Sequence, residues 1–276
     1  FLYRKNIWKK FFEINAKKVD IGGGIFGNIR VKPIRRGKMG LIKSKKFWAV
    51  SIIAVLLVSF MFLATACCGT STTNVSTYAE FVDALKGTSE VIKLEKDIVI
   101  DSTLVVEREV ILDMNGKTIS NEVDVWNVEE NNWSVISVRA GGNLIVEGNG
   151  KIQAKENDCY AIDVMDGGHL VVNDGEFVGN IHAVYVYEGS AEIKGGKYSI
   201  QQKSEVQGKP NEFVLNLEDA HRKEDTASIV VTGGTFVEFN PQNCKAEGDN
   251  TNFVKDGYVA TLDKTASVPT YVVSAE

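Results

Sequence analysis

The sequence has few of the residues that build metal or phosphate sites. Its 276 residues include 3 His and 4 Cys, and no two Cys have the Cys-x-x-Cys spacing of a zinc site. Glycine-containing segments such as Asn149-Gly150-Lys151 are not followed by a helical pattern, so they do not form a phosphate-binding loop. We therefore expect no metal site and no cofactor. Proline is also scarce, with 4 residues against 25 Gly, a composition typical of a β-rich chain with many turns.

The chain lacks an even distribution of charge. Its net charge of −5 combines a basic segment, residues 1–66, with 14 Lys/Arg and 2 Asp/Glu, and an acidic segment, residues 67–276, with 17 Lys/Arg and 34 Asp/Glu. The acidic segment carries a balance of −17, which argues against a nucleic-acid partner and against unaided binding of polyanionic sugars.

One pattern occurs three times within residues 134–198: SVISVRAGGNLIVEGNGKI, AIDVMDGGHLVVNDGEF and AVYVYEGSAEIKGGKY. Each copy has two short strands that alternate apolar and polar residues, with glycine-bearing turns between and after them. If the copies are aligned, Val146, Val172 and Ile193 occupy one position. A second aligned set contains Ile152, Phe177 and Tyr198.

Copies this short have no room for a helical crossover between strands. Stacking them as successive coils, with equivalent strands in parallel about 4.8 Å apart, would place like residues over like. The alternative is an antiparallel sandwich or barrel, which also suits closely spaced strands. The recurrence of the same residue class at the same place favours the stacked arrangement, and we expect an all-β parallel β-helix over residues 77–240.

Both ends of this repeat region carry segments of another character. Residues 77–86 have apolar residues at helical spacing, with Ser76 or Thr77 as N-cap and Glu80 in the capping-box position. We expect a short helix that caps the first coil. Residues 241–276 contain a Pro/Asn loop and two strands, 258–262 and 270–273, which predict a β-hairpin cap at the other end.

The segment before the repeats is typical of an exported protein. Residues 1–38 are basic without a regular period, and we expect them to be either a disordered leader or a non-native extension ahead of Met39. Residues 39–66 combine a Lys-rich start with an almost unbroken apolar run, as export signals do. Residues 67–76 are polar, and we expect them to be a tether without structure of its own.

The end of the apolar run leaves three forms of export open. Leu63-Ala64-Thr65-Ala66-Cys67 is similar to a bacterial lipobox displaced by one residue, which favours lipidation of Cys67. Ala64-Thr65-Ala66 also fits a simple cleavage site, which would give a secreted protein. About 20 apolar residues are also enough for an uncleaved membrane anchor. Each form places residues 69–276 outside the cytoplasm, either at the cell surface or secreted.

The repeats and the run xIxLxxDIxIDSTLxVxxxVxLDxNGxTI, at residues 91–119, resemble the right-handed parallel β-helix of the pectate-lyase-like superfamily, in particular surface proteins of gut-type anaerobic bacteria. The resemblance covers roughly residues 76–273. It implies a right-handed solenoid of about seven coils. Enzymes of this superfamily bind polysaccharide along one outer face, but members of the family differ in function.

Stacking predicts a strip of outward side chains on the first strand of each copy. The residues of this candidate ligand-binding strip are Arg139, Asp163, Tyr185, Tyr187 and Asn216. A sugar-binding groove would combine carboxylates, an Arg and aromatic rings in this way; the alternative is an ordinary solvated sheet, in which Tyr is a favoured residue. Residues 121–133 interrupt the repeats, and Trp126 and Trp133 either contact a ligand or pack the insertion onto its coil.

These features predict a monomeric, non-catalytic module on the cell surface that binds polysaccharide, host glycans or envelope components. The alternative is a small polysaccharide lyase or glycoside hydrolase, which would need paired carboxylates on adjacent coils. Asp163 has no such partner in register, and we assign no catalytic residue. His169 and His182 are expected at the surface near turns. Cys159 and Cys244 are either a disulfide or two separate thiols.

Overall fold

The structure is a computed structural model that describes residues 70–155, 158–203, 205–206, 209–210, 212–244, 247–248 and 251–276. The predicted leader, export signal and lipidation site at Cys67 lie outside these residues. Within them, no helix is long and apolar enough to cross a membrane.

Most of the described residues in regular structure are strands, grouped in three large sheets. Sheet A has the order β1 (Thr72–Val75), β2 (Val91–Leu94), β5 (Glu109–Asp113), β8 (Asn143–Glu147), β11 (Gly168–Val172), β14 (Gly189–Ile193) and β19 (Ala227–Val231). Sheet B has the order β3 (Ile98–Ile100), β6 (Thr118–Asn121), β9 (Lys151–Gln153), β12 (Glu176–Gly179), β15 (Lys197–Ile200), β20 (Gly234–Val237), β22 (Thr270–Ala275) and β21 (Tyr258–Leu262). Sheet C has the order β4 (Leu104–Val106), β7 (Ser134–Val138), β10 (Tyr160–Val164), β13 (His182–Val186) and β18 (Leu215–Leu217).

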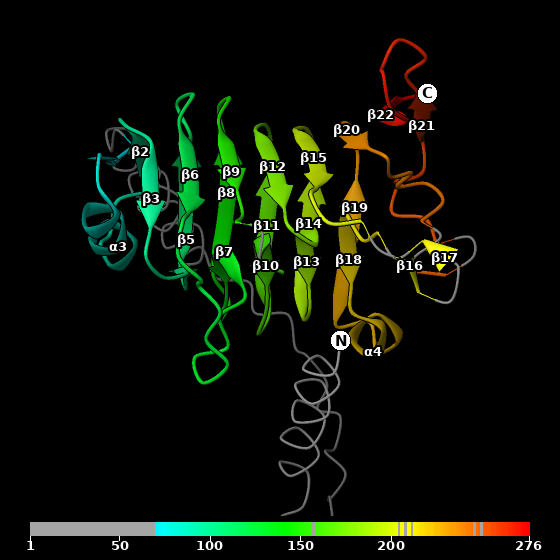
Figure 1. Cartoon of the computed structure of the whole chain (residues 1–276). Helices are drawn as coiled ribbons and strands as arrows, with labels where there is room; N and C mark the ends of the chain where they lie inside the picture. Colours follow the sequence, from blue (N-terminus) through cyan, green and yellow to red (C-terminus); the bar gives the residue numbers. More distant parts are fainter. Residues whose placement is uncertain are drawn as a thin grey trace, which may run out of the picture. The chain divides into compact units, whose positions relative to one another are not determined.

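The smaller elements are two short helices, α3 (Tyr78–Lys86) and α4 (Asp219–Lys223), and a two-stranded ribbon of β16 (Glu205–Val206) and β17 (Lys209–Pro210). Figure 1 shows the strands of the three sheets side by side along the body, with α3 at one end and the β21/β22 hairpin at the other. The prediction of an all-β protein is confirmed.

The chain visits the three sheets in rotation, and this sets the pairing. From β7 to β15 successive strands belong to sheets C, A and B in turn, and β18, β19 and β20 repeat that order. All pairs between these strands are parallel. This pairing contradicts the antiparallel alternative and is compatible with the predicted parallel β-helix.

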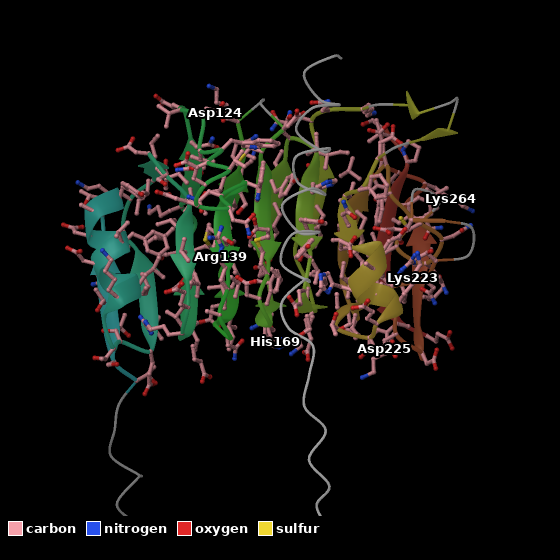
Figure 2. All side chains as sticks on the ribbon, turned by 90° about the horizontal axis from the view of Figure 1, so that it is seen from below. Asp124, Arg139, His169, Lys223, Asp225 and Lys264 are labelled. Atoms are coloured by element: carbon pink, nitrogen blue, oxygen red, sulfur yellow. The ribbon has the colours of Figure 1, made fainter. Side chains whose placement is uncertain are left out.

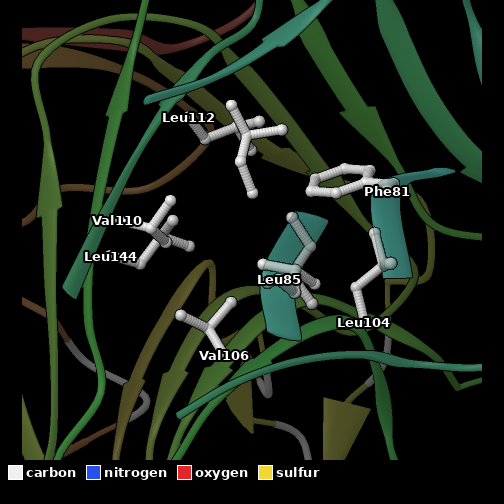
Figure 3. Close-up of a pocket in the computed structure, with 9 residues that line it drawn as sticks. Phe81, Leu85, Leu104, Val106, Val110, Leu112 and Leu144 are labelled. Atoms are coloured by element: carbon white, nitrogen blue, oxygen red, sulfur yellow. The ribbon is translucent and has the colours of Figure 1, made fainter. Parts of the chain in front are cut away.

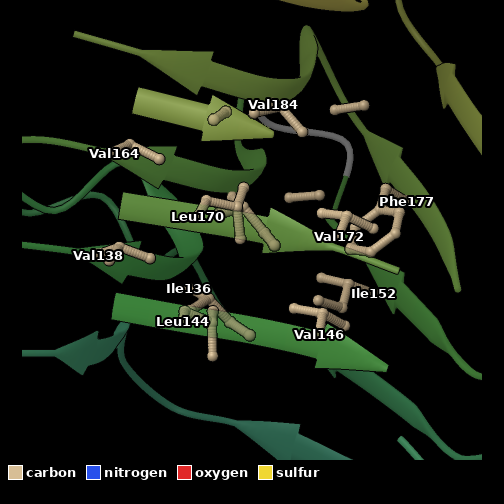
Figure 4. Close-up of a cluster of buried hydrophobic side chains, with 14 of the residues drawn as sticks. Ile136, Val138, Leu144, Val146, Ile152, Val164, Leu170, Val172, Phe177 and Val184 are labelled. Carbon is tan, nitrogen blue, oxygen red and sulfur yellow. The ribbon is translucent and has the colours of Figure 1, made fainter. Parts of the chain in front are cut away.

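The core consists of columns of like residues, as the repeats predict. Val146 pairs in register with Val172, which pairs with Ile193 and so with Val231, and all four are fully buried. Figure 4 shows Val146 and Val172 one above the other in this cluster. A second column runs through Ile152, Phe177, Tyr198 and Phe236.

The aromatic members of the second column stack face to face. The ring centroids of Phe177 and Tyr198 lie 5.1 Å apart with an angle of 9° between the planes. Those of Tyr198 and Phe236 lie 5.0 Å apart with an angle of 12°. Hydrogen-bonded parallel strands, about 4.8 Å apart, impose this geometry, because equivalent side chains leave adjacent strands in the same direction.

The helix α3 covers one end of the core, as expected. Thr77 is its N-cap, because the Thr77 hydroxyl accepts a hydrogen bond from the backbone N–H of Glu80, while the Glu80 carboxylate accepts one from Ser76 N–H at 2.7 Å. Its apolar face points inward: Figure 3 shows Phe81 and Leu85 facing the apolar side chains of Leu104, Val106, Val110, Leu112 and Leu144.

The other end is closed by the predicted hairpin. β21 and β22 pair antiparallel, and β22 also pairs antiparallel with β20, the last strand of sheet B in the parallel series. Val273 of β22 is buried against the core. The edge of β20, which would otherwise expose its backbone groups, is therefore paired.

The prediction for residues 67–76 is wrong in one respect. Residues 72–75, expected in an unstructured tether, form β1 and pair in parallel with β2. Val75 is fully buried in the core column above Leu94, so a polar segment with a single Val completes the first layer of sheet A. Residues 219–223 form α4, whose N-cap is Glu218.

The aromatic column gives a direct stability prediction. Phe177→Ala should lower the free energy of unfolding by about 3–5 kcal/mol, because it opens a cavity between Ile152 and Tyr198. Val230→Ala, at an outward position with 37% exposure, should change it by less than about 0.5 kcal/mol. Denaturant unfolding of both variants checks this, and equal losses would contradict the column.

The close spacing of the turns gives a second prediction. A Cβ on Gly168 would lie 2.5 Å from the backbone oxygen of Val138, whereas one on Gly167 would meet nothing within 4 Å, although its φ is +74°. Gly168→Ala should therefore destabilise more than Gly167→Ala, whose cost is limited to about 1–2 kcal/mol of left-handed strain. Thermal unfolding of the two single variants measures the difference, and the reverse order would be inconsistent with the stacked turns.

Candidate functional site

The outward side chains of sheet C form two adjacent columns, which together we call the outer strip. Strand register aligns Ser137, Asp163, Tyr185 and Asn216 in the first column. The second column contains Arg139, Met165, Tyr187 and Glu218, since the backbone N–H of each donates to the preceding strand. The five predicted ligand-binding residues therefore do lie on one face.

Much of the outer strip is covered, which corrects the expectation of a solvent-facing surface. Ser137 and Asp163 are 0% exposed, and every residue of β7 and β10 is buried. A separate hydrophobic cluster outside the core covers this part of the strip. It consists of Trp133, Tyr160 and Met165, with Trp126, Ile181, Tyr185 and Tyr187 packed against it.

The insertion, residues 121–133, supplies the tryptophans of this cluster. The rings of Trp126 and Trp133 meet edge to face with centroids 4.5 Å apart. Trp133 Nε1 donates to Asn131 Oδ1 at 2.8 Å, and Asn127 and Asn132 form an antiparallel bridge. The arrangement supports the alternative in which the two tryptophans pack the insertion onto its coil.

Arg139 holds the insertion in place instead of pointing to solvent. Its guanidinium donates from Nη1 to the Glu130 carbonyl at 3.0 Å and from Nη2 to the carbonyl of Asn131 and to Asn132 Oδ1. Its Nε donates to Ser137 Oγ at 2.6 Å. Figure 2 labels both Arg139 and Asp124 of the insertion among the green segments. Most of the hydrogen-bond donors of the guanidinium are thus used within the protein.

Asp163 is the most unusual group on this face. Its side chain is fully buried, and neither carboxylate oxygen has a hydrogen-bond partner of normal geometry among the described residues. Burial raises the pKa of Asp163 to about 6, although the nearby Ser137 hydroxyl and the Arg139 guanidinium act to lower it. Burial raises the pKa of the Cys159 thiol to about 12, and the Asp163 carboxylate adds to this shift.

His182 and Asn216 bind each other rather than facing solvent. His182 Nδ1 lies 2.9 Å from the Phe213 carbonyl and Nε2 lies 3.0 Å from Asn216 Nδ2, so a neutral ring donates through Nδ1 and accepts through Nε2. Burial lowers the pKa of His182 to about 4. The prediction of a surface histidine is wrong, because Tyr160 and Tyr185 pack against the ring at 4.8 and 5.5 Å.

The accessible end of the outer strip lies at Tyr185 and Tyr187. Both side chains are half-buried, and their ring centroids are 6.3 Å apart. The ring of His221 meets Tyr187 edge to face at 4.7 Å. Glu218 positions His221, because its carboxylate accepts from the backbone N–H groups of Ala220 and His221 at the start of α4. Sequence reasoning missed His221 since the segment around it reads as a loop.

Other candidate groups lie apart from this face or do not assemble into a site. His169 is on sheet A, where its Nδ1 lies 2.6 Å from Ser190 Oγ. Cys159 and Cys244 are both buried and are not joined by a disulfide. Across the described ranges, no three His, Cys, Asp or Glu side chains gather to hold a metal ion.

The bonds made by Arg139 predict a local effect of its removal. Arg139→Ala should increase amide hydrogen exchange within residues 126–133 by about ten-fold or more, since it removes four hydrogen bonds to a charged group. Arg222→Ala, which removes an exposed ion pair with Asp219, is the matched control and should leave this segment unchanged. Equal exchange in both variants would contradict the role of Arg139.

Comparison of the chain with models of known protein families, with curated proteins and with solved structures found no match. The case for a function therefore rests on the geometry of the outer strip.

Proposed function

We propose that the protein is a non-catalytic, cell-surface module that binds a glycan at the accessible end of the outer strip. The observation that carries the proposal is the pair of half-buried rings, Tyr185 on β13 and Tyr187 directly after it, whose centroids lie 6.3 Å apart. Aromatic rings presented by a rigid sheet can stack against pyranose faces, and the planes of these two rings are inclined to each other by 58°.

Polar groups border the two rings. Asn216 is the register partner of Tyr185 but its amide donates to His182, so the nearest polar group beside Tyr187 is Glu218. His221 forms the far edge. Hydroxyl groups of a sugar would find hydrogen-bond acceptors and donors in this border. The acidic balance of residues 67–276 favours neutral or amino sugars over uronic acid polymers.

The binding function is favoured over the lyase or hydrolase alternative by the position of Asp163. An acid or base must come within hydrogen-bonding reach of its substrate. Asp163 has no exposed surface, so no sugar can reach it in this arrangement. The strip therefore offers stacking surfaces without an accessible catalytic carboxylate.

The fold proposed to present this surface is a right-handed parallel β-helix of about seven coils, of the pectate-lyase-like kind. The rotation of the chain through sheets C, A and B supports it. The right hand follows the strong preference of parallel crossover connections. We further propose that residues 39–66 direct export and that Cys67 carries a lipid anchor, which would place the monomeric body at the cell surface.

A binding measurement tests the proposal. The full chain is titrated by calorimetry with neutral plant and host oligosaccharides and with amino-sugar oligomers. Tyr187→Ala should weaken binding about ten-fold, which corresponds to about 1.4 kcal/mol of lost stacking. Tyr271→Ala, which removes a half-buried ring on the β21/β22 hairpin, is the matched control and should leave affinity unchanged.

Two outcomes would overturn this function. One is the lack of binding to every oligosaccharide class. The other is release of reducing ends or unsaturated products that stops on Asp163→Ala, which would establish the enzyme alternative.

A further inference from the structure

The insertion covers a carboxyl group that the proposed function does not use. Asp163 is 0% exposed on the outer face of β10, where the cluster of Trp133, Tyr160 and Met165 also lies. Its two oxygens have no hydrogen bond of normal geometry among the described residues, and only the hydroxyl groups of Ser137 and Ser134 and the Arg139 guanidinium favour its ionised form. Burying an ionised carboxylate with so little compensation is costly, whereas burying the neutral acid costs much less. The closed arrangement is therefore suited to the protonated acid.

We propose that the insertion is a pH-dependent cover, which closes over the outer strip when Asp163 takes up a proton and lifts when Asp163 ionises. The suggestion that this cover regulates glycan binding rests on the proposed function. The movement of the cover itself does not require a ligand and is tested without one.

The insertion is the element that can move at least cost. β10, which carries Asp163, is paired on both sides with β7 and β13, so exposing the carboxyl from the sheet side would break two ladders. The tip of the insertion is held by Arg139 and by a contact of 3.6 Å between Asn131 Nδ2 and Met165 Sδ. Its residues 128–130 are exposed. Lifting the tip hydrates Asp163 while every strand pair stays intact.

Several charged or titratable groups surround Asp163. Arg139 from the end of β7 favours its ionised form, and Asp166 from the turn after β10 opposes it. The insertion itself carries four carboxylates, Glu122, Asp124, Glu129 and Glu130. The other groups are Cys159, just before β10, and Tyr160, His182 and Tyr185 on the strands. Burial raises the pKa of Cys159, Tyr160 and Tyr185.

The direction of the pH effect follows from the Asp163 pKa. In the closed form the pKa is about 6, against an ordinary value of 3.8. Below pH 3.8 both forms are protonated and the cover is most stable. Between these values the closing equilibrium constant should fall by about 100-fold in total, and above pH 6 it should stay at its lower value.

His182 would act with the opposite sign. Its pKa is lowered to about 4 in the closed form, so its burial disfavours closure as the pH falls from its ordinary value of 6.5. A cover controlled by His182 would therefore loosen on acidification, whereas one controlled by Asp163 tightens. The direction of the transition separates the two groups.

The tryptophans make the movement measurable. Of the four Trp, Trp126 and Trp133 lie in the insertion, and Trp8 and Trp48 lie outside the described residues. In the full chain with Trp8→Phe and Trp48→Phe, acrylamide quenching of tryptophan fluorescence reports on the insertion alone. We expect quenching to increase as the pH rises from 4.5 to 7.5.

Three variants test the origin of the transition. Asp163→Asn should remove it and keep quenching low at every pH. Asp166→Asn, at an exposed neighbouring carboxylate, should retain it. Ser137→Ala removes a hydroxyl that lowers the Asp163 pKa, so it should move the transition to higher pH. This third variant keeps the test decisive if Asp163→Asn does not fold, as judged by circular dichroism.

A pH-independent signal in the parent chain, a transition that persists in Asp163→Asn, an unmoved midpoint in Ser137→Ala, or quenching that increases on acidification would each overturn the proposal. If the transition occurs but no oligosaccharide binds, the cover stands and the glycan function fails. If oligosaccharides bind with the same affinity at pH 4.5 and 7.5 and the signal is flat, the glycan function stands and the cover fails.

Discussion

Parallel stacking of equivalent residues is the constraint on which the rest of the structure depends. A column such as Val146, Val172 and Ile193 fixes the register of sheet A, and that register then determines which side chains become neighbours on the outside. The columns of sheet C follow from the same rule, so Asp163 lies between Ser137 and Tyr185 whether or not that placement is favourable for a carboxylate. A shift of one residue would exchange the buried and outward sets.

The outer strip shows how a regular sheet accommodates an irregular insertion. The insertion leaves the coil after β6 and returns as β7, and its tryptophans bury a face that alternation alone would leave in water. Arg139 compensates by bonding to carbonyl groups of the insertion that would otherwise lack partners. Asp163 is compensated less, by the hydroxyl groups of Ser137 and Ser134 and by the Arg139 guanidinium. The covered half of the strip therefore contains a buried carboxyl group. Tyr187 lies at the accessible end of the strip.

The columns and both end caps could be predicted because they depend on local patterns. Period-two alternation and the recurrence of Val146, Val172 and Ile193 are visible in the sequence, and so is the capping box at Thr77 and Glu80. The cover was not predictable from alternation, since it depends on tertiary contact between the insertion and sheet C. One signal was present: Met165 and Tyr160 are large apolar residues near outward positions of β10, where a solvated strand would carry polar ones. β1 was not predicted because Val75 is its only buried residue and the segment has no apolar alternation.

The most direct measurement of the stacked register is disulfide cross-linking on the outside of sheet A, in a chain whose own Cys are replaced by Ser. Glu192 and Val230 are register partners on β14 and β19, close enough for a disulfide between parallel strands, whereas Ser228 lies two residues away from that position. We predict that Glu192→Cys forms a disulfide with Val230→Cys and not with Ser228→Cys. Preferential cross-linking to position 228, or none to either, would contradict the stacked columns.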